Sequence, residues 1–406
     1  MISLLAGFRV IDMTSLLGAV TTTKLADLGA DVIRIEQPPH GDYMRGIPPI
    51  LPKQGVGLNY VMVNRNKRSL GIDLGSDEGR GIFFKLIATA DVVVENARPG
   101  VWDARGFGYE SLRAVKPDII YASVSGFGQS GPYKGLPSHG LNIDAAAGMF
   151  EIVRGPSGRP EISSSSGVGV ELGALNGAFV IAAALLQRNR TGEGKYIDAS
   201  MWDAAVAYNT AFRQALNFQE GEPGRDAFPR SGGRGARMNT YGTKDDKVLF
   251  IVPIEKKFWI RFCTAVGRED WVDRGTWELP VDFGEDDPSL RDDIEEVMRT
   301  RTAEEWMDAL TAADVPVTPV LLPADLESNA HVQERGMIAR STDPRYSGVK
   351  FVRAPTRVSG EEFEIEIPPP AVGEHTKSLL TELGYSENEQ ERLATEGIIV
   401  NAEVND

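Results

Sequence analysis

The sequence has few of the residues that form disulfides and metal sites. Its 406 residues include one cysteine, Cys263, so no disulfide can form within the chain. A lone cysteine suits a reducing compartment, and we expect a cytoplasmic protein. The other ligand candidates, His40, His331 and His375, lack metal-ligand spacing with one another or with Cys263. We therefore predict that the protein binds no metal.

Positive charge and long apolar runs are also scarce. The 43 lysines and arginines stand against 58 aspartates and glutamates, and the net charge is −15. This balance argues against nucleic acid or an anionic membrane as the main partner, so local basic groups must bind any anionic ligand. No apolar run reaches the roughly 18 residues of a membrane span. The run Leu175–Leu186 is shorter and has the length of a buried helix. Residues 1–7 lack the basic leader of a signal peptide, so we expect a soluble protein with no membrane partner.

Alternating strands and helices at the start of the chain predict a parallel sheet. Residues 8–13 predict a strand, residues 21–28 a helix that Gly29 ends, and residues 30–36 a second strand. Such a βαβ unit places its two strands parallel. Ligands of these folds bind beyond the carboxyl ends of the strands, here near residues 15–19 and 36–41. The turn after the first strand has no GxGxxG motif, so nothing there indicates a dinucleotide.

Later segments extend this pattern and suggest a second domain. Strands are predicted at residues 91–95 and 119–124, and the loops that follow them contain glycines that let a ligand approach the backbone. The chain length favours two domains. Residues 221–242 are rich in Gly, Arg and Pro, as a linker is, and Thr302 begins a Thr-x-x-Glu pattern that predicts a helix start.

The stretch from Ser138 to Glu171 contains the candidate catalytic side chains. His139 precedes a run of small apolar residues that predicts a buried helix, and Glu171 opens a second apolar run. Both groups therefore lie at or near a helix start, where unpaired N–H groups suit a carboxylate or a developing oxyanion. An acidic residue at such a position is more often a simple helix cap, so position alone does not establish a catalytic role.

Several motifs together resemble those of the family III CoA-transferases, a superfamily that also contains carnitine CoA-transferase, formyl-CoA transferase and α-methylacyl-CoA racemase. The motifs are Gly7–Asp12, Ala26–Ile33, Asn66–Leu70, Glu95–Gly100, Ser125–Tyr133, Arg190–Gly194, Gln333–Ile338 and Gly373–Thr376. The resemblance covers nearly the whole chain. It implies an α/β protein in which residues 1–220 and 326–406 form a Rossmann-like large domain. Residues 221–325 would form an inserted smaller α+β domain with its linkers, and two subunits would interlock as a homodimer.

The resemblance also implies that coenzyme A is bound as a substrate thioester. The expected CoA-binding residues are Leu16, Asn96, Ala97, Arg98, Arg105, Lys134 and Gly140. Of these, Arg98, Arg105 and Lys134 would meet the phosphates of the adenosine end. Family members often carry the second basic residue one place earlier, where this chain has Ala104.

A first interpretation is a CoA-transferase that moves CoA between an acyl-CoA donor and a carboxylic acid. Transferases of this family use an aspartate that attacks the thioester and then carries CoA as an enzyme-bound thioester. Counting back from Arg190–Gly192, this aspartate should fall at Gly169 or Val170, neither of which can act. Glu171 is the next residue, and its extra methylene could restore the reach. Glu171 is then the candidate nucleophile.

Two further interpretations stay open. His139 stands where related racemases carry a catalytic histidine, and Glu255 lies in a segment like the one whose glutamate orients it, which would raise the imidazole pKa. A 2-methylacyl-CoA racemase would use His139 and Glu171 as opposed bases, although racemases usually have aspartate where this chain has Gly140. The missing aspartate also fits a CoA-thioester binder without catalysis. The sequence does not identify the acyl group or the acceptor acid.

Overall fold

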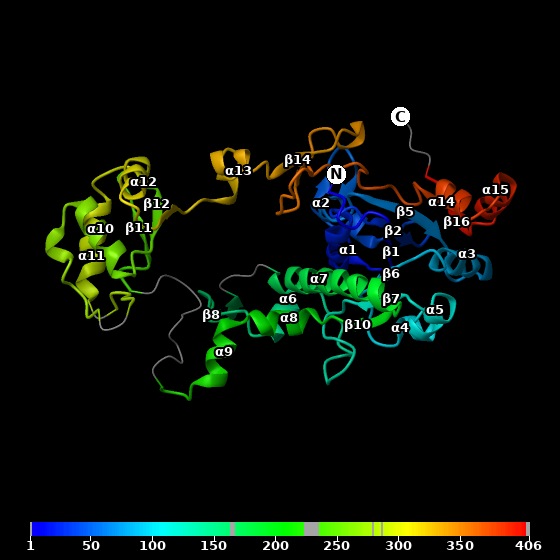
Figure 1. Cartoon of the computed structure of the whole chain (residues 1–406), viewed down its shortest axis with the longest axis horizontal. Coiled ribbons are helices and arrows are strands. Elements are labelled where there is room, and N and C mark those ends of the chain that lie inside the picture. Colours follow the sequence, from blue (N-terminus) through cyan, green and yellow to red (C-terminus); the bar gives the residue numbers. More distant parts are fainter. Residues whose placement is uncertain (1, 163–166, 223–234, 278–279, 286, 403–406) are drawn as a thin grey trace. The chain divides into compact units, whose positions relative to one another are not determined.

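The chain divides into two compact units (Figure 1), one of residues 1–209 with 331–406 and one of residues 210–330. The computed structural model describes residues 2–162, 167–222, 235–277, 280–285 and 287–402. The domain boundaries expected from the sequence, 220/221 and 325/326, both lie inside the second unit. Residues 223–234 of the expected linker lie outside the described residues.

A mostly parallel sheet forms the centre of the first unit. Within the described residues it has seven strands in the order β10-β7-β6-β1-β2-β5-β16. These strands are β1 (Arg9–Asp12), β2 (Asp31–Glu36), β5 (Lys67–Ile72), β6 (Val92–Glu95), β7 (Ile120–Ser123), β10 (Lys195–Asp198) and β16 (Ile399–Val400). All neighbours are parallel except β16, which pairs antiparallel with β5. The α/β class and the strands expected near residues 8–13, 30–36, 91–95 and 119–124 are confirmed.

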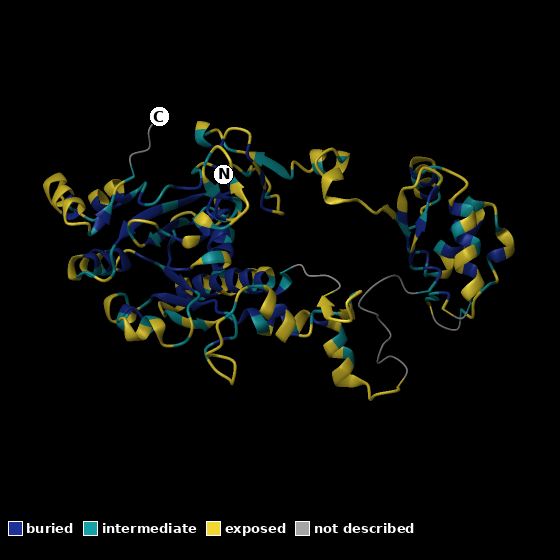
Figure 2. Ribbon diagram, turned by 180° about the vertical axis from the view of Figure 1, so that it is seen from behind, coloured by how far each residue is buried: buried dark blue, intermediate teal, exposed yellow. Residues whose placement is uncertain are grey.

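Helices cover both faces of this sheet, which explains why its strands are almost continuously apolar. Val10 packs with α1 (Ala19–Ala26), α7 (Val168–Thr191) and α8 (Met201–Tyr208). The adjacent Ile11 points to the opposite face and packs with α3 (Asp77–Ile87), α5 (Tyr109–Val115), α14 (Thr376–Glu382) and α15 (Glu387–Thr395). Figure 2 shows the sheet as buried and the outer faces of these helices as exposed.

The helix α7 is the longest helix in the described part of the chain. Its glycines allow close packing, because a Cβ at Gly173 would lie 2.6 Å from Met201 of α8 and one at Gly177 would lie 3.1 Å from Val124. Its length and apolar composition would suffice for a membrane span, yet half of it is buried inside the protein, as in a core helix. It is also longer than the sequence suggested for Leu175–Leu186. Leu175 and Phe179 on its other side are exposed.

Shorter elements join these layers. The remaining helices of the first unit are η1 (Leu16–Gly18), η2 (Tyr43–Gly46), α2 (Leu58–Met62), α4 (Val101–Ala104), α6 (Leu141–Ala146) and η5 (Pro344–Tyr346). Its two-stranded sheets are β3 (Ile50–Leu51) with β4 (Val56–Gly57), β8 (Ile152–Arg154) with β9 (Pro160–Ile162), and β14 (Ile338–Arg340) with β15 (Lys350–Val352). Helix α13 (Ala330–Glu334) spans the boundary between the two units.

The second unit has its own core around an antiparallel sheet of β11 (Asn239–Gly242), β12 (Val248–Ile251) and β13 (Val317–Pro319). Its helices are α9 (Thr210–Asn217), α10 (Lys256–Val266), η3 (Glu269–Trp271), α11 (Pro288–Met298), α12 (Ala303–Ala312) and η4 (Pro323–Asp325). Trp259, Trp271 and Trp306 are fully buried in this core. The predicted helix start at Thr302 is confirmed, because Thr302 and Glu305 form a capping box at α12.

Candidate functional site

Four of the predicted site residues line one cavity at the carboxyl ends of the strands. We call it the His139 cavity; its volume is about 240 Å³. Its lining residues are Leu16, Leu17, Gly18, Met44, Ile47, Asn59, Asn96, Gly126, Ser138, His139, Gly140, Ile143, Val170 and Met201. Among these, His139 alone has a titratable side chain. The cavity is therefore mainly apolar, with one imidazole and two carboxamides as its polar side chains besides Ser138.

His139 lies in the loop before α6. Its backbone N–H donates to Asn142 Oδ1 at 2.6 Å, which fixes the turn into the helix, while its side chain is exposed. The start of α7 is tied to the same region, because the Gly169 N–H donates to the buried Asp144 Oδ1 at 2.6 Å. The loop with His139 and the first turn of α7 thus lie side by side around the cavity.

Glu171 does not line the His139 cavity. It lines a second one of about 380 Å³, the Glu171 cavity, together with Lys24, Arg65 and Arg353. The Lys24 Nζ lies 3.3 Å from Glu171 Oε2, and the Glu171 side chain is 61% exposed. Successive side chains on a helix point about 100° apart, so Val170 faces the His139 cavity while Glu171 points toward α1. His139 and Glu171 are therefore not brought into one cavity.

Glu255 belongs to the second unit. It is the residue before α10, and its backbone forms an isolated bridge with Val281. Glu255 and His139 thus belong to different units, and their expected pairing stays a prediction.

Basic groups expected to bind phosphate line a third cavity. This Lys134 cavity, of about 200 Å³, contains Ala97, Arg98 and Lys134, and it shares Asn96 and His139 with the His139 cavity. Arg98 Nη1 donates to the Gly135 carbonyl at 3.3 Å. Within the described residues neither Arg98 nor Lys134 is paired with a carboxylate, so both charges remain available to an anion.

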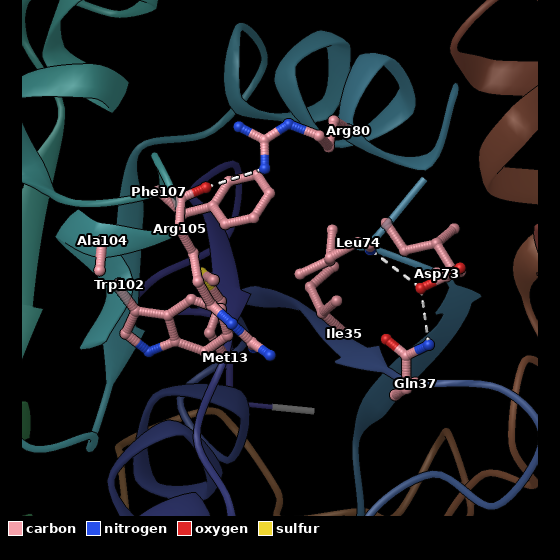
Figure 3. Close-up of a pocket in the computed structure, with 12 residues that line it drawn as sticks. Met13, Ile35, Gln37, Asp73, Leu74, Arg80, Trp102, Ala104, Arg105 and Phe107 are labelled. Atoms are coloured by element: carbon pink, nitrogen blue, oxygen red, sulfur yellow. Dashed lines mark hydrogen bonds between the residues drawn. The ribbon is translucent and has the colours of Figure 1, made fainter. Parts of the chain in front are cut away.

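Arg105 lies in a fourth and larger cavity, of about 540 Å³, at the ends of β1, β2 and β5 (Figure 3). The Arg105 guanidinium carbon is 5.5 Å from the Trp102 ring centroid. Arg80 from α3 donates to the Arg105 carbonyl at 2.8 Å and lies 4.5 Å above the Phe107 ring. Two guanidinium groups beside aromatic rings suit a nucleobase with its phosphate. The sequence did not single out Arg80, because only the folded chain brings α3 beside this loop.

A buried carboxylate supports the loop that carries Asn96, Ala97 and Arg98. The Glu95 Oε2 atom at the end of β6 accepts the Ala97 N–H at 2.6 Å. Burial raises the pKa of Glu95 to about 7, and the carboxylates of Asp103 and Asp198 add to the rise. The sequence reasoning missed this role. No group of three or more His, Cys, Asp or Glu residues in the described part of the chain could hold a metal ion.

Comparison with known proteins gives a family model that matches most of the chain. Residues 5–376 match the model described as CoA-transferase family III.

Curated relatives match along nearly their whole length. An acetyl-CoA:oxalate CoA-transferase of Acetobacter aceti is 32% identical over 385 residues, which cover 94% of this chain and 96% of that protein. A succinyl-CoA:mesaconate CoA-transferase of Haloarcula hispanica is 32% identical over 397 residues, which cover 93% of this chain and 95% of that protein. A formyl-CoA:oxalate CoA-transferase of Rhodopseudomonas palustris is 29% identical, with 97% of both chains covered.

Solved structures show the same fold. A CAIB/BAIF family protein from Brucella suis has a TM-score of 0.77 and 27% identity, covering 94% of this chain and 100% of that one. The Rv3272 protein of Mycobacterium tuberculosis has a TM-score of 0.78 and 27% identity, covering 92% and 98%.

Proposed function

This chain belongs to CoA-transferase family III, and from that premise we propose that its His139 cavity receives the thioester end of an acyl-CoA. The enzyme transfers CoA from an acyl-CoA donor to a carboxylic acid. The observation that carries the placement is the shared wall of two cavities, since Asn96 and His139 line both the apolar His139 cavity and the cationic Lys134 cavity. An apolar acyl end and an anionic diphosphate can then be bound side by side.

CoA binds in this proposal with its adenosine end away from the reacting carbon. The diphosphate meets Arg98 and Lys134, and the adenine with its ribose phosphate enters the cavity of Arg80, Trp102 and Arg105. The supporting feature is charge, because guanidinium and ammonium groups gather there in a chain of net charge −15. Small carboxylic acids such as the oxalate and mesaconate named for the relatives are the acceptor class we propose.

Glu171 is the proposed nucleophile. Its carboxylate attacks the thioester carbonyl and the C–S bond breaks. The CoA thiolate departs, and the acyl group is then joined to Glu171 as a mixed anhydride. The thiolate then attacks the glutamyl carbonyl and releases the donor's acyl group as a carboxylate, which leaves CoA bound to Glu171 as a thioester. The acceptor carboxylate reverses both steps and departs as the new acyl-CoA.

This role requires Glu171 to leave its position beside Lys24. The ion pair is 3.3 Å long and largely exposed, and exposed pairs of this kind stabilise a protein by at most about 1 kcal/mol. Breaking this ion pair therefore costs little, which supports a rotamer change of Glu171 toward the Val170 side in the proposed reaction.

The decisive measurement is the intact mass of the protein after incubation with acyl-CoAs. We expect a CoA-sized increase in the native protein that is lost in Glu171→Gln and kept in Glu110→Gln, an exposed glutamate on α5. A native protein that turns over acyl-CoA and acid without any covalent mass increase, even under single-turnover conditions, would exclude Glu171 as nucleophile.

A second candidate, acyl-CoA racemisation, is favoured by one observation. His139 is the titratable side chain of an otherwise neutral cavity, where an imidazole could remove a proton from the carbon next to the thioester. Repeating the incubation in D₂O distinguishes the two, because only racemisation introduces deuterium at that carbon. The names of the relatives support a working transferase and give no support to a thioester binder without catalysis.

We also propose that the protein is a cytoplasmic homodimer. The exposed fractions of Leu175, Phe179 and Leu186 on α7 are 52%, 70% and 63%. These three side chains form an apolar stripe on one helix, and such exposed stripes commonly mark association surfaces. The single cysteine supports the cytoplasmic location.

A further inference from the structure

One wall of the His139 cavity is a turn held in an unusual backbone conformation. The turn consists of Leu16, Leu17 and Gly18, which all line the cavity. Leu16 has a φ of +53°, a left-handed value that residues with a side chain rarely adopt. Such a conformation persists only where its surroundings enforce it, and it gathers at functional sites. The groups that hold Leu16 therefore decide the shape of this wall.

Asn96 holds the turn from one side. Its side-chain oxygen accepts the Ser15 N–H at 2.9 Å, and its side-chain nitrogen donates to the Ser15 carbonyl at 2.9 Å. A Cβ at Gly18 would lie only 2.3 Å from the Asn96 amide nitrogen, so glycine permits this close approach. Asn96 itself lines the cavity, so it contacts both the turn and the bound substrate of the proposed function.

Asp42 holds the turn from the other side without lining any of the cavities described above. Its Oδ2 atom accepts the Leu16 N–H at 3.1 Å and is ion-paired with the Arg34 guanidinium, while its Oδ1 atom accepts the Met44 N–H at 2.8 Å. The side chains of Asp42 and Arg34 are 3% and 1% exposed. The carboxylate is thus enclosed, and each of these contacts fixes its direction.

Arg34 connects this carboxylate to the end of β1. Its Nη1 atom lies 3.1 Å from Asp12 Oδ2, and its Nη2 atom donates to the Thr14 carbonyl at 3.2 Å. Because a guanidinium group is planar, these contacts set the plane in which Asp42 is bound. Arg34 and Asp42 therefore link the Leu16 N–H to the end of the central strand β1 and fix its position.

We propose that Asp42, oriented by Arg34, is a positioning residue of the transfer reaction: it holds the left-handed Leu16 so that the turn of Leu16–Gly18 stands against the bound thioester. This inference rests on the proposed function, because it takes the His139 cavity as the thioester site. Asp42 touches neither substrate nor cofactor in this arrangement. Its effect on the reaction passes through the backbone of Leu16.

The first test is the kinetics of Asp42→Asn. Asparagine keeps an oxygen for the Leu16 N–H but loses the charge that pairs with Arg34. We expect kcat to fall by about 10- to 100-fold, the size of effect that a small misplacement near the reacting atoms produces, with the Kd of CoA changed by less than about twofold. The Kd of CoA changes less than kcat because the adenosine end of CoA binds in another cavity in the proposed function.

Asp91→Asn is the matched control. Asp91 also accepts a backbone N–H, from Arg9 at 2.7 Å, and also pairs with a buried arginine, Arg188, at 2.7 Å. It lies at the amino end of β6, whereas the cavities lie at the carboxyl ends of the strands. We expect this variant to lower Tm as Asp42→Asn does and to keep the native kcat.

A double-mutant cycle with Leu16→Gly tests the route of the effect. Glycine adopts a positive φ without strain, so the turn no longer depends on Asp42. We expect Asp42→Asn to lower kcat much less when combined with Leu16→Gly than it does alone. An equal loss in both backgrounds would overturn the proposal, as would an Asp42→Asn variant with lower Tm and native kcat.

Amide hydrogen exchange gives a readout that does not require turnover. We expect the Leu16 N–H to exchange at least tenfold faster in Asp42→Asn than in the native protein, and unchanged in Asp91→Asn. If the native protein transfers no CoA between any tested acyl-CoA and acid, the proposed function fails, while unchanged exchange at Leu16 would overturn the role of Asp42 by itself.

Discussion

At the scale of single residues, Glu95 links the pH of the solution to the loop that binds CoA in the proposed function. Burial raises its pKa to about 7, so the folded protein keeps this proton at pH values where the unfolded chain, with an ordinary pKa of about 4.5, has lost it. The contribution of Glu95 to the free energy of unfolding therefore falls as pH rises from about 4.5 to about 7, and the cost of the buried charge is complete above that range.

Glu95→Gln should remove this dependence. Glutamine keeps an oxygen for the Ala97 N–H and cannot ionise, so we expect the variant to exceed the native protein by about 2 kcal/mol in unfolding free energy at pH 8 and by much less at pH 5. Urea denaturation at several pH values measures the difference. Native and variant curves that stay parallel from pH 5 to pH 8 would contradict this assignment.

The sequence indicated where several candidate residues meet and left the direction of others open. The family resemblance implied CoA-binding roles for Leu16, Asn96 and Gly140 and a catalytic role for His139; these roles stay predictions, while the structure has all four residues lining one cavity, where loops after parallel strands meet. Glu171 lies where the helix start was expected, but one residue turns a helical side chain by about 100°, and counting along the chain does not resolve that angle.

At the scale of elements, close packing of α7 explains why a helix rich in glycine persists. Gly173 faces Met201 of α8, and a Cβ added at Gly173 would lie only 2.8 Å from the Met201 Cα, so added atoms have no room there. A Cβ added at Gly81 in α3 would have no atom within 4 Å. The same residue type thus serves packing in one helix and costs helix stability in the other.

These two glycines give opposite expectations for the same substitution. Gly173→Ala should destabilise the protein by about 1–3 kcal/mol through overpacking, and Gly81→Ala should stabilise it by up to about 1 kcal/mol through helix propensity. Thermal and urea unfolding of both variants measure this. A stabilising Gly173→Ala would mean that α7 and α8 can separate without cost.

The elements also show where prediction from sequence ends. Short apolar runs identified β1, β2, β6 and β7, because buried parallel strands need such runs. The boundaries of the two units differ from those expected, since α9 has the composition of an ordinary amphipathic helix and nothing local to it indicates which unit it joins. That choice depends on contacts between segments distant in the sequence.

At the scale of the whole molecule, the apolar stripe of α7 predicts self-association. Leu175 and Phe179 are exposed on the side of α7 that faces away from the sheet. Replacing both with glutamate should shift the protein from dimer to monomer in sedimentation velocity measurements, because both carboxylates would lose their hydration in the interface. Val115→Glu on α5, which covers the other face of the sheet, should keep the native sedimentation coefficient. A native protein that sediments as a monomer at all accessible concentrations would contradict the proposal.

The antiparallel strand β16 has a consequence for the order in which the protein matures. It covers β5, and the Asp73 N–H next to β5 donates to the Ile398 carbonyl at 2.8 Å, so the edge beside the Arg105 cavity is completed by a segment synthesised after every other strand of its sheet. The second unit, contiguous from 210 to 330, has all of its residues earlier. During translation all residues of the second unit therefore precede the last strand of the first unit, and β5 remains an uncovered edge strand until residues 398–400 have been synthesised.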